Sequence, residues 1–310
     1  MNIKELLKAM AKNVHLYNKG GYSYFLNKSK EICRVSNSSI KELESLTSDD
    51  TLYVFDGNGF SVAPHTEEGS NLIAQSNMFE CMFDEINISA KILKEVANFK
   101  EDKYANDTCK HLYLDKDNNR VVATTGHVLN VISDVDLSYL KHSLPLPFNT
   151  IVGLKETSLI SYAKDDNKVN YKIKTGELES IVIVYNFSYY DIQCLLKQID
   201  YNVVKLGFDL QSHKFTKKDY LAYDKDGKAG VYLLNTLTKN PDENNVFIKG
   251  DSLDLTTKSE LGGVFGEKLA ELMGEAESLW IYDTNDFMRK PILVKYKDGN
   301  KLSLVMPLKL

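Results

Sequence analysis

A pattern of one strand, one helix and three further strands occurs three times along the chain, and it constrains the fold more than any other feature. Strands are recognised by alternating apolar residues, and helices by apolar residues three or four positions apart. The three occurrences span residues 82–132, 148–186 and 253–310. A unit that recurs in this way indicates an α+β architecture built by repetition.

The three repeats each contain one expected helix. In the first repeat the helix begins at Ser89 and carries its apolar residues on one face. The second repeat predicts a strand over 148–154 and then a helix over 155–164. The third repeat predicts a helix over 264–276 that follows a strand over 253–257.

Residues 1–76 predict a smaller α/β module with a different order of elements. Apolar residues at helical spacing predict a helix over 2–18, which a Gly-Gly pair ends. Two short strands, a helix over 36–46 and a hairpin follow. Residues 65–77 are polar and aperiodic and are expected to form a linker. The sequence therefore predicts three parts, which are residues 1–76, 78–203 and 204–310.

Composition limits the classes of function. The chain has 310 residues, which is enough for two or three domains. Its 38 Lys and Arg against 43 Asp and Glu give a net charge of −5, which disfavours a protein that coats nucleic acid or membrane with its whole surface. The four cysteines form no CxxC pair and fit a reducing compartment. No signal peptide or membrane span is recognised, so a cytoplasmic location is expected.

The sequence lacks the common motifs for catalysis, metal binding and cofactor binding. Segments 115–120 and 224–228 resemble the start of a calcium loop but lack its glycine and closing glutamate at the required spacing, so hairpin turns are expected. The sequence contains no phosphate-binding glycine motif, no HExxH and no GxSxG. We therefore expect a non-catalytic protein with no cofactor and no metal.

Two segments have an unusual composition. In VVATTGHVLNVI (121–132) a small polar corner is followed at once by an aliphatic strand, although a plain glycine-containing hairpin would also explain it. The chain ends on the apolar segment LSLVMPLKL, whereas termini are usually polar. Because Pro307 stops strand pairing, this segment is expected to lie in a groove or to form one wall of a groove.

These segments resemble one protein family. VATTGHVLNV is similar to the V-A-T-D-G-H-R-L-A-V segment of bacterial DNA polymerase III beta subunits, the sliding clamps, and LVMPLKL is similar to their V-V-M-P-M-R-L terminus. FSYYDIQCLL (187–196) resembles the F-P-D-Y-x-x-V stretch of the clamp's middle domain. The resemblance covers residues 78–310 and implies the DNA clamp fold, in which βαβββ units place helices on one face of antiparallel sheets.

The resemblance implies a hydrophobic pocket that binds short peptides of DNA polymerase, the clamp loader and repair proteins. Thr125 and Val128 stand where the family has Asp and Arg, so a more apolar pocket is expected. Aliphatic and Met side chains suit the Leu and Phe anchors of such peptides. The implied walls are Thr124, Gly126, His127, Val128 and Leu129; Tyr190, Cys194 and Leu195; and Met306, Pro307, Leu308, Lys309 and Leu310.

The resemblance also implies a ring that encircles double-stranded DNA without reading its sequence, which reconciles an acidic protein with a DNA function. Lys91 and Lys94 lie opposite the apolar face of the first repeat's helix and are the expected DNA-facing residues. Glu267 and Glu271 on the third repeat's helix would repel phosphate. Since six clamp domains form the family's ring, two domains per chain imply a homotrimer, and a degenerate third domain implies a dimer.

A second hypothesis remains open from the residues of the N-terminal module. Its helix, strand and hairpin order also resembles a winged helix, with residues 38–46 as the recognition helix. The protein would then be a DNA-binding regulator or adaptor that uses its clamp-like part as a platform for peptides.

Overall fold

The structure is a computed structural model. It describes residues 2–10, 15–56, 58–64, 66–97, 107–126, 128–197, 199 and 291–305, together with the strands named below between residues 204 and 282 and at 308–309. The chain forms two compact units. The first contains Met1–Lys91 and Asn149–Asn186, and the second contains Ile92–Phe148 and Phe187–Leu310.

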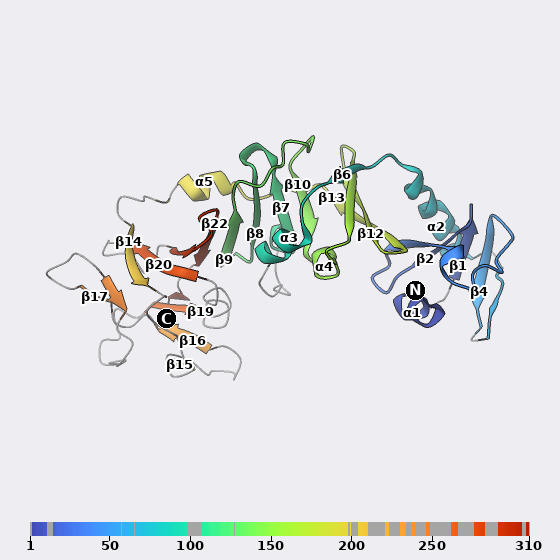
Figure 1. Cartoon of the computed structure of the whole chain (residues 1–310), viewed down its shortest axis with the longest axis horizontal. Coiled ribbons are helices and arrows are strands. Elements are labelled where there is room, and N and C mark those ends of the chain that lie inside the picture. Colours follow the sequence, from blue (N-terminus) through green and yellow to red (C-terminus); the bar gives the residue numbers. More distant parts are fainter. Residues whose placement is uncertain are drawn as a thin grey trace. The chain divides into compact units, whose positions relative to one another are not determined.

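The first unit contains a nine-stranded antiparallel sheet to which distant parts of the chain contribute (Figure 1). The N-terminal strands pair with the second repeat where β3 lies beside β13. The order across the sheet is β5 (Phe60–Val62), β4 (Thr51–Phe55), β1 (His15–Lys19), β2 (Tyr22–Leu26), β3 (Ile32–Ser36), β13 (Leu178–Tyr185), β12 (Lys168–Thr175), β11 (Leu159–Lys164) and β6 (Asp84–Ile86).

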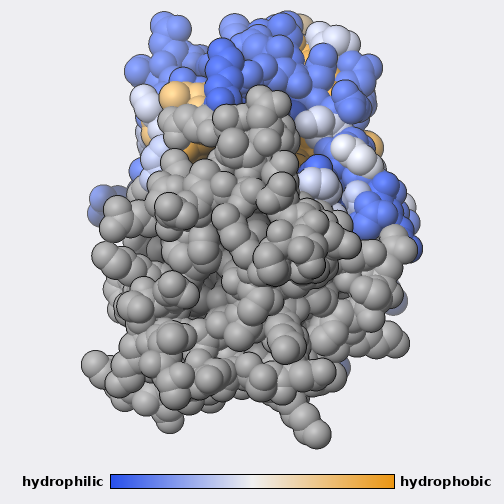
Figure 2. Space-filling model, turned by 90° about the vertical axis from the view of Figure 1, so that its left-hand side faces the viewer, coloured by the Kyte–Doolittle hydropathy of each residue, from blue (hydrophilic) through white to orange (hydrophobic). Residues whose placement is uncertain are grey.

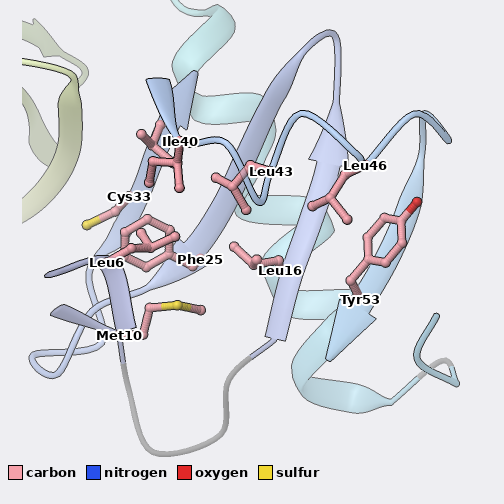
Figure 3. Packing of buried hydrophobic residues seen from close by; sticks show 10 residues of the cluster. Leu6, Met10, Leu16, Phe25, Cys33, Ile40, Leu43, Leu46 and Tyr53 are labelled. Carbon is pink, nitrogen blue, oxygen red and sulfur yellow. The ribbon is translucent and has the colours of Figure 1, made fainter. Parts of the chain in front are cut away.

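Both faces of the N-terminal part of this sheet are covered, because successive side chains of a strand point to opposite faces. On one face Leu16 and Phe25 pack against α1 (Ile3–Ala9) and the segment 40–46 (Figure 3). On the other face their neighbours Tyr17 and Tyr24 pack against α2 (Glu67–Ser76) and the 3-10 helix η2 (Asn77–Glu80). The module therefore has two layers of core around a single sheet.

A partly buried ion pair lies where β3 meets β13. Arg34 and Glu179 are register partners, and the Arg34 Nε and Nη2 atoms both lie 2.8 Å from Glu179 Oε2. The guanidinium also lies 4.6 Å from the ring centroids of Tyr22 and Phe79. Arg34 thus joins the N-terminal module to the second repeat through charge, hydrogen bonding and packing together.

The second unit is built around an eight-stranded antiparallel sheet (Figure 1). Its order is β10 (Leu144–Pro147), β7 (His111–Asp115), β8 (Arg120–Thr124), β9 (Val128–Ile132), β22 (Lys301–Val305), β21 (Ile292–Tyr296), β20 (Ala276–Tyr282) and β14 (Val204–Asp209). A four-stranded sheet contains β15 (Leu221–Ala222), β16 (Gly230–Leu233), β19 (Gly262–Phe265) and β23 (Leu308–Lys309). Strands β17 (Leu237–Lys239) and β18 (Val246–Ile248) form a separate pair.

The pairing of β9 with β22 joins the first repeat to the third, and a buried polar chain supports it. Ser303 Oγ donates to Asn130 Oδ1 at 2.6 Å, and Asn130 Nδ2 donates to the carbonyl of Val96 at the end of α3 (Ala90–Val96) at 3.0 Å. Lys301 Nζ lies 2.8 Å from Glu95 Oε1, also on α3. The helix is therefore held on the sheet by polar bonds made at the junction of the two repeats.

The predicted helix over 2–18 is wrong beyond its first half. A capping box between Asn2 and Glu5 starts α1 as expected, but the helix ends at Ala9, and His15–Lys19 forms β1. This strand pairs with β2 and β4 and buries Leu16 and Tyr17, which a surface helix could not do. Tertiary pairing therefore overrides the local helical spacing.

The predicted helix over 36–46 is also wrong, and so the recognition helix of the second hypothesis does not exist. Asn37–Ser39 forms a 3-10 turn, and turns follow to residue 45. Ile40, Leu43 and Leu46 are 2%, 0% and 6% exposed and fill the core beneath α1 (Figure 3). Their spacing of three residues arises from consecutive turns, and the segment covers one face of the sheet.

Other expectations for helices and linkers are corrected in the same way. The expected linker 65–77 contains α2, which the Thr66 hydroxyl caps and which buries Leu72. Where a strand was expected over 148–154, the structure has the helix α4 (Phe148–Val152). Where a helix was expected over 155–164, residues 159–164 form the strand β11. A strand, a helix and three strands do follow one another here as β10, α4, β11, β12 and β13, but the strand β10 precedes the expected start at residue 148 and belongs to the other sheet.

The third repeat can be compared only in part. The expected helix over 264–276 begins instead with the last residues of β19, and residues 266–275, with Glu267 and Glu271, lie outside the described residues. The expected strand over 253–257 and the segment 224–228 also lie outside them. Strands β20, β21 and β22 confirm the three strands expected at the end of the chain.

Replacing Arg34 by Ala is expected to lower the free energy of unfolding by about 2–3 kcal/mol, because Glu179 loses its short charged hydrogen bonds. Urea denaturation measures the change. The matched control is Lys174→Ala, since Lys174 Nζ lies 3.4 Å from the other Glu179 oxygen but its side chain is 52% exposed. That control should cost less than about 1 kcal/mol, and an equal loss in both variants would contradict the importance of the junction.

Candidate partner-peptide site

On one face of the eight-stranded sheet, a short helix packs in one apolar cluster with residues of the strands on both sides of the β9–β22 junction. The helix is α5 (Ile192–Lys197), and its Ile192 and Leu196 point into an apolar cluster with Ile199. The cluster is formed by strands from both repeats, with Val122, Leu129 and Val131 on one side and Leu293, Leu302, Leu304 and Trp280 on the other. The helix and the sheet together thus make an apolar site at the junction.

The segment before α5 is fixed by aromatic stacking. The rings of Tyr189 and Tyr113 stack at 4.4 Å between centroids, and Tyr189 Oη donates to the carbonyl of His111 at 3.2 Å. Phe187 lies 4.8 Å from the His111 ring. Burial raises the pKa of Tyr189 well above its ordinary value, so the hydroxyl stays protonated as a donor. These contacts hold the chain just before α5 against strand β7.

The corner at 124–128 is held by its own threonines. Thr124 Oγ1 donates to the carbonyl of Val128 at 2.8 Å and accepts from the Gly126 amide at 3.0 Å, and Thr125 Oγ1 accepts from the Val128 amide at 3.1 Å. Gly126 has a φ of +85°, a conformation that favours glycine. Thr125 is therefore a structural residue of the corner, with its hydroxyl bonded to the backbone.

The structure brings some of the predicted wall residues together. Leu129 belongs to the apolar cluster beneath α5, and Thr124 ends the neighbouring strand β8. Tyr190 and Leu195 are 43% and 44% exposed, and Cys194 is also exposed. Val128 is buried, and strand alternation turns it to the face opposite Leu129. Val128 therefore does not share the face of the predicted wall.

The third predicted wall lies at the end of the chain. Strand β22 ends at Val305, and the backbone of Leu308 and Lys309 forms β23, which pairs with Gly262 and Gly263 of β19. The chain thus leaves the eight-stranded sheet and joins the four-stranded sheet across Met306 and Pro307. His127, Met306, Pro307 and Leu310 lie outside the described residues.

Several residues of the apolar cluster were not expected to belong to the site. Ile192, Leu196 and Tyr189 lie beside the predicted residues Tyr190, Cys194 and Leu195, and Leu304 lies in strand β22; all four belong to the cluster. The four-residue spacing of Ile192 and Leu196 is the sequence signal that could have identified the buried face of α5. Leu293 and Trp280 carry no such signal, because only strand pairing brings them here.

The two lysines expected to face DNA are exposed on α3. Leu93 and Val96 of that helix are fully buried, whereas Lys91 and Lys94 point to solvent. The expected separation of apolar and basic faces is therefore present on this helix. Whether these lysines contact DNA stays a prediction.

Residues 115–120 form a hairpin turn, in which the Asp115 carboxylate accepts from Asn118 and Arg120. The described residues contain no group of three or more metal-binding side chains. Among them, no helix is long and apolar enough to cross a membrane.

The described surface in Figure 2 is mainly hydrophilic, with small groups of apolar residues.

Replacing Gly126 by Ala is expected to cost about 1 kcal/mol of stability, measured by urea denaturation, through strain at positive φ. Steric contact is not the cause, since an added Cβ meets only Cys109 Sγ at 3.9 Å. Gly153→Ala is the control, because its Cβ meets only a carbonyl oxygen at 3.8 Å and its φ lies outside the left-handed region. Equal stability of the two variants would contradict the strained corner.

Comparison with known proteins gives a consistent result for the fold. At the level of sequence, no family model and no curated protein matches the chain. Solved structures do match it. The sliding clamp of Bacillus subtilis has a TM-score of 0.55 at 11% identity, covering 99% of this chain and 96% of the clamp.

Two other bacterial clamps give similar values. The DNA polymerase III beta subunit of Thermotoga maritima has a TM-score of 0.52 at 13% identity, covering 98% of this chain and 95% of its own. The Helicobacter pylori beta clamp, solved with a DNA ligase peptide, has a TM-score of 0.52 at 13% identity, covering 99% and 96%. The expected fold is confirmed: this chain has the fold of the bacterial DNA polymerase III beta subunits, the sliding clamps.

Proposed function

We propose that this protein is a sliding clamp, a non-catalytic processivity factor that encircles duplex DNA and tethers a replicative polymerase to it. The single observation that carries this proposal is the end-to-end match to clamp structures, which covers 98–99% of this chain and 95–96% of theirs. A match of that extent includes the N-terminal module, for which the sequence left both a winged helix and a degenerate clamp domain open.

The proposed ring is a dimer. If residues 1–76 stand for a reduced first clamp domain, residues 78–203 and 204–310 are the second and third, and two chains supply six domains. A closed ring with cyclic symmetry satisfies every interface, whereas an open chain does not. The edge strand β5, with Val62 69% exposed, leaves one edge of the first unit's sheet available for pairing.

The proposed contact with DNA is loose and independent of base sequence. A ring holds DNA by its topology, so it needs only weak contacts from lysines to phosphates. Lys91 and Lys94 on α3 supply such contacts in this proposal, and their exposure supports it. The net charge of −5 is then no obstacle, because a ring needs only a local basic face to meet the phosphates.

The proposed partner site is the apolar junction beneath and beside α5. The Helicobacter pylori clamp was solved with a ligase peptide, and the corresponding occupant here would be a short peptide with apolar anchors. Exposed Leu195 and Tyr190 and the chain end at 306–310 would contact it. The partners that we propose for this site are a DNA polymerase and a clamp loader. The protein would meet them in the cytoplasm.

Retention on DNA tests the ring. The protein should be retained on linear duplex whose two ends are blocked after binding, and it should be lost from the same duplex with free ends. Lys91→Glu combined with Lys94→Glu should reduce retention severalfold at low salt. Lys155→Glu combined with Lys197→Glu, at two exposed positions outside α3, is the charge-matched control. Loss that does not depend on the ends would contradict a ring.

Substitution at the chain end tests the peptide site. Met306→Ala combined with Leu308→Ala should weaken binding of a fluorescent ligase peptide at least tenfold, because the peptide's apolar anchors lose their partners. Fluorescence anisotropy measures affinity, and circular dichroism verifies the fold. Val152→Ala, at a position 80% exposed in the first unit, is the control. Unchanged affinity in the double variant would contradict the site.

A further inference from the structure

A buried arginine lies on the same face of the sheet as α5. Arg120 and Asp115 are register partners on β8 and β7, and they are 5% and 6% exposed. Arg120 Nε donates to Asp115 Oδ2 at 2.6 Å. Asn118 Nδ2 in turn lies 3.1 and 3.0 Å from the two Asp115 oxygens. The guanidinium is therefore fixed in place by the hairpin itself.

The same guanidinium reaches α5. Arg120 Nη1 donates to Gln193 Oε1 at 3.0 Å, and this bond joins residues 73 positions apart. Gln193 lies between Ile192, which is buried in the apolar cluster, and Cys194, which is exposed. The hydrogen bond thus meets the helix at the boundary between its buried and exposed faces.

A helix of six residues needs such a contact. It is too short to be stable alone, so its position depends on what it packs against. The burial of Ile192 and Leu196 stabilises the packing of α5 on the sheet. It does little to fix the helix's rotation, because apolar contacts are not directional. A guanidinium held on one side by a carboxylate is directional and charge-assisted, and so it can fix the rotation of α5 about its axis.

We propose that Arg120, anchored by Asp115, is a positioning residue of the peptide site. It holds α5 through Gln193 so that Cys194 and Leu195 face the peptide while Ile192 stays in the sheet. The binding of a peptide at this site rests on the proposed function. The hydrogen bond between Arg120 and Gln193 does not depend on it. It adds to the site a residue that touches no peptide and acts only through α5.

Two substitutions at Gln193 test this with the fluorescent ligase peptide. Gln193→Ala removes the acceptor for Arg120 and should weaken peptide binding about tenfold, mainly through faster dissociation. Gln193→Glu keeps an acceptor and gives it a charge, so it should retain the wild-type affinity. Lys197→Ala, at an exposed position on the same helix, should also retain it. Unfolding midpoints should agree among all four proteins.

Hydrogen exchange separates this proposal from the proposed function. The amides of residues 192–197 should exchange faster in Gln193→Ala than in the wild type and Gln193→Glu, with no peptide present. If the wild type binds no peptide, the peptide site is refuted. The exchange rates alone then decide whether Arg120 positions α5. The positioning role is overturned if Gln193→Ala matches the wild type in exchange, or if Gln193→Glu loses peptide affinity as Gln193→Ala does.

Discussion

Backbone pairing between strands of different repeats is the constraint on which the rest of this structure depends. The β9–β22 pair joins the first repeat to the third, and the β3–β13 pair joins the N-terminal module to the second. In each case one continuous antiparallel sheet takes strands from sequence segments more than a hundred residues apart. A repeat therefore cannot complete its sheet without its neighbour, and the strand edges that meet at each junction are paired.

Each junction has its own stabilising chemistry. At β3–β13 a charged pair, Arg34 with Glu179, lies among aromatic rings. At β9–β22 the two faces differ: Asn130 and Ser303 bond to each other on one face, and Leu129 and Leu304 join the apolar cluster on the other. The polar face holds α3 with its lysines, and the apolar face holds α5. The proposed DNA contact and peptide site thus share one pair of strands.

The sequence allowed the repeat and most strands to be predicted, since strands show alternation, as in 170–174, or runs of apolar residues, as in 181–185. It failed where tertiary pairing decides. Residues 15–19 have helical spacing yet form a central strand, and residues 40–46 have it yet form turns over a core. Of the proposed site, the segments 121–132 and 187–196 were expected from their composition and from the family resemblance, but the helix α5 was not predicted. Arg120 was not predicted either, because a contact across 73 residues leaves no local pattern.

The central claim is that chains of this fold close into a ring, and images of single particles test it most directly. Negative-stain images of the purified protein at micromolar concentration should show rings with a central hole wide enough for duplex DNA. Light scattering on the same sample should give twice the mass of one chain. Particles with no hole and the mass of a single chain would contradict the account.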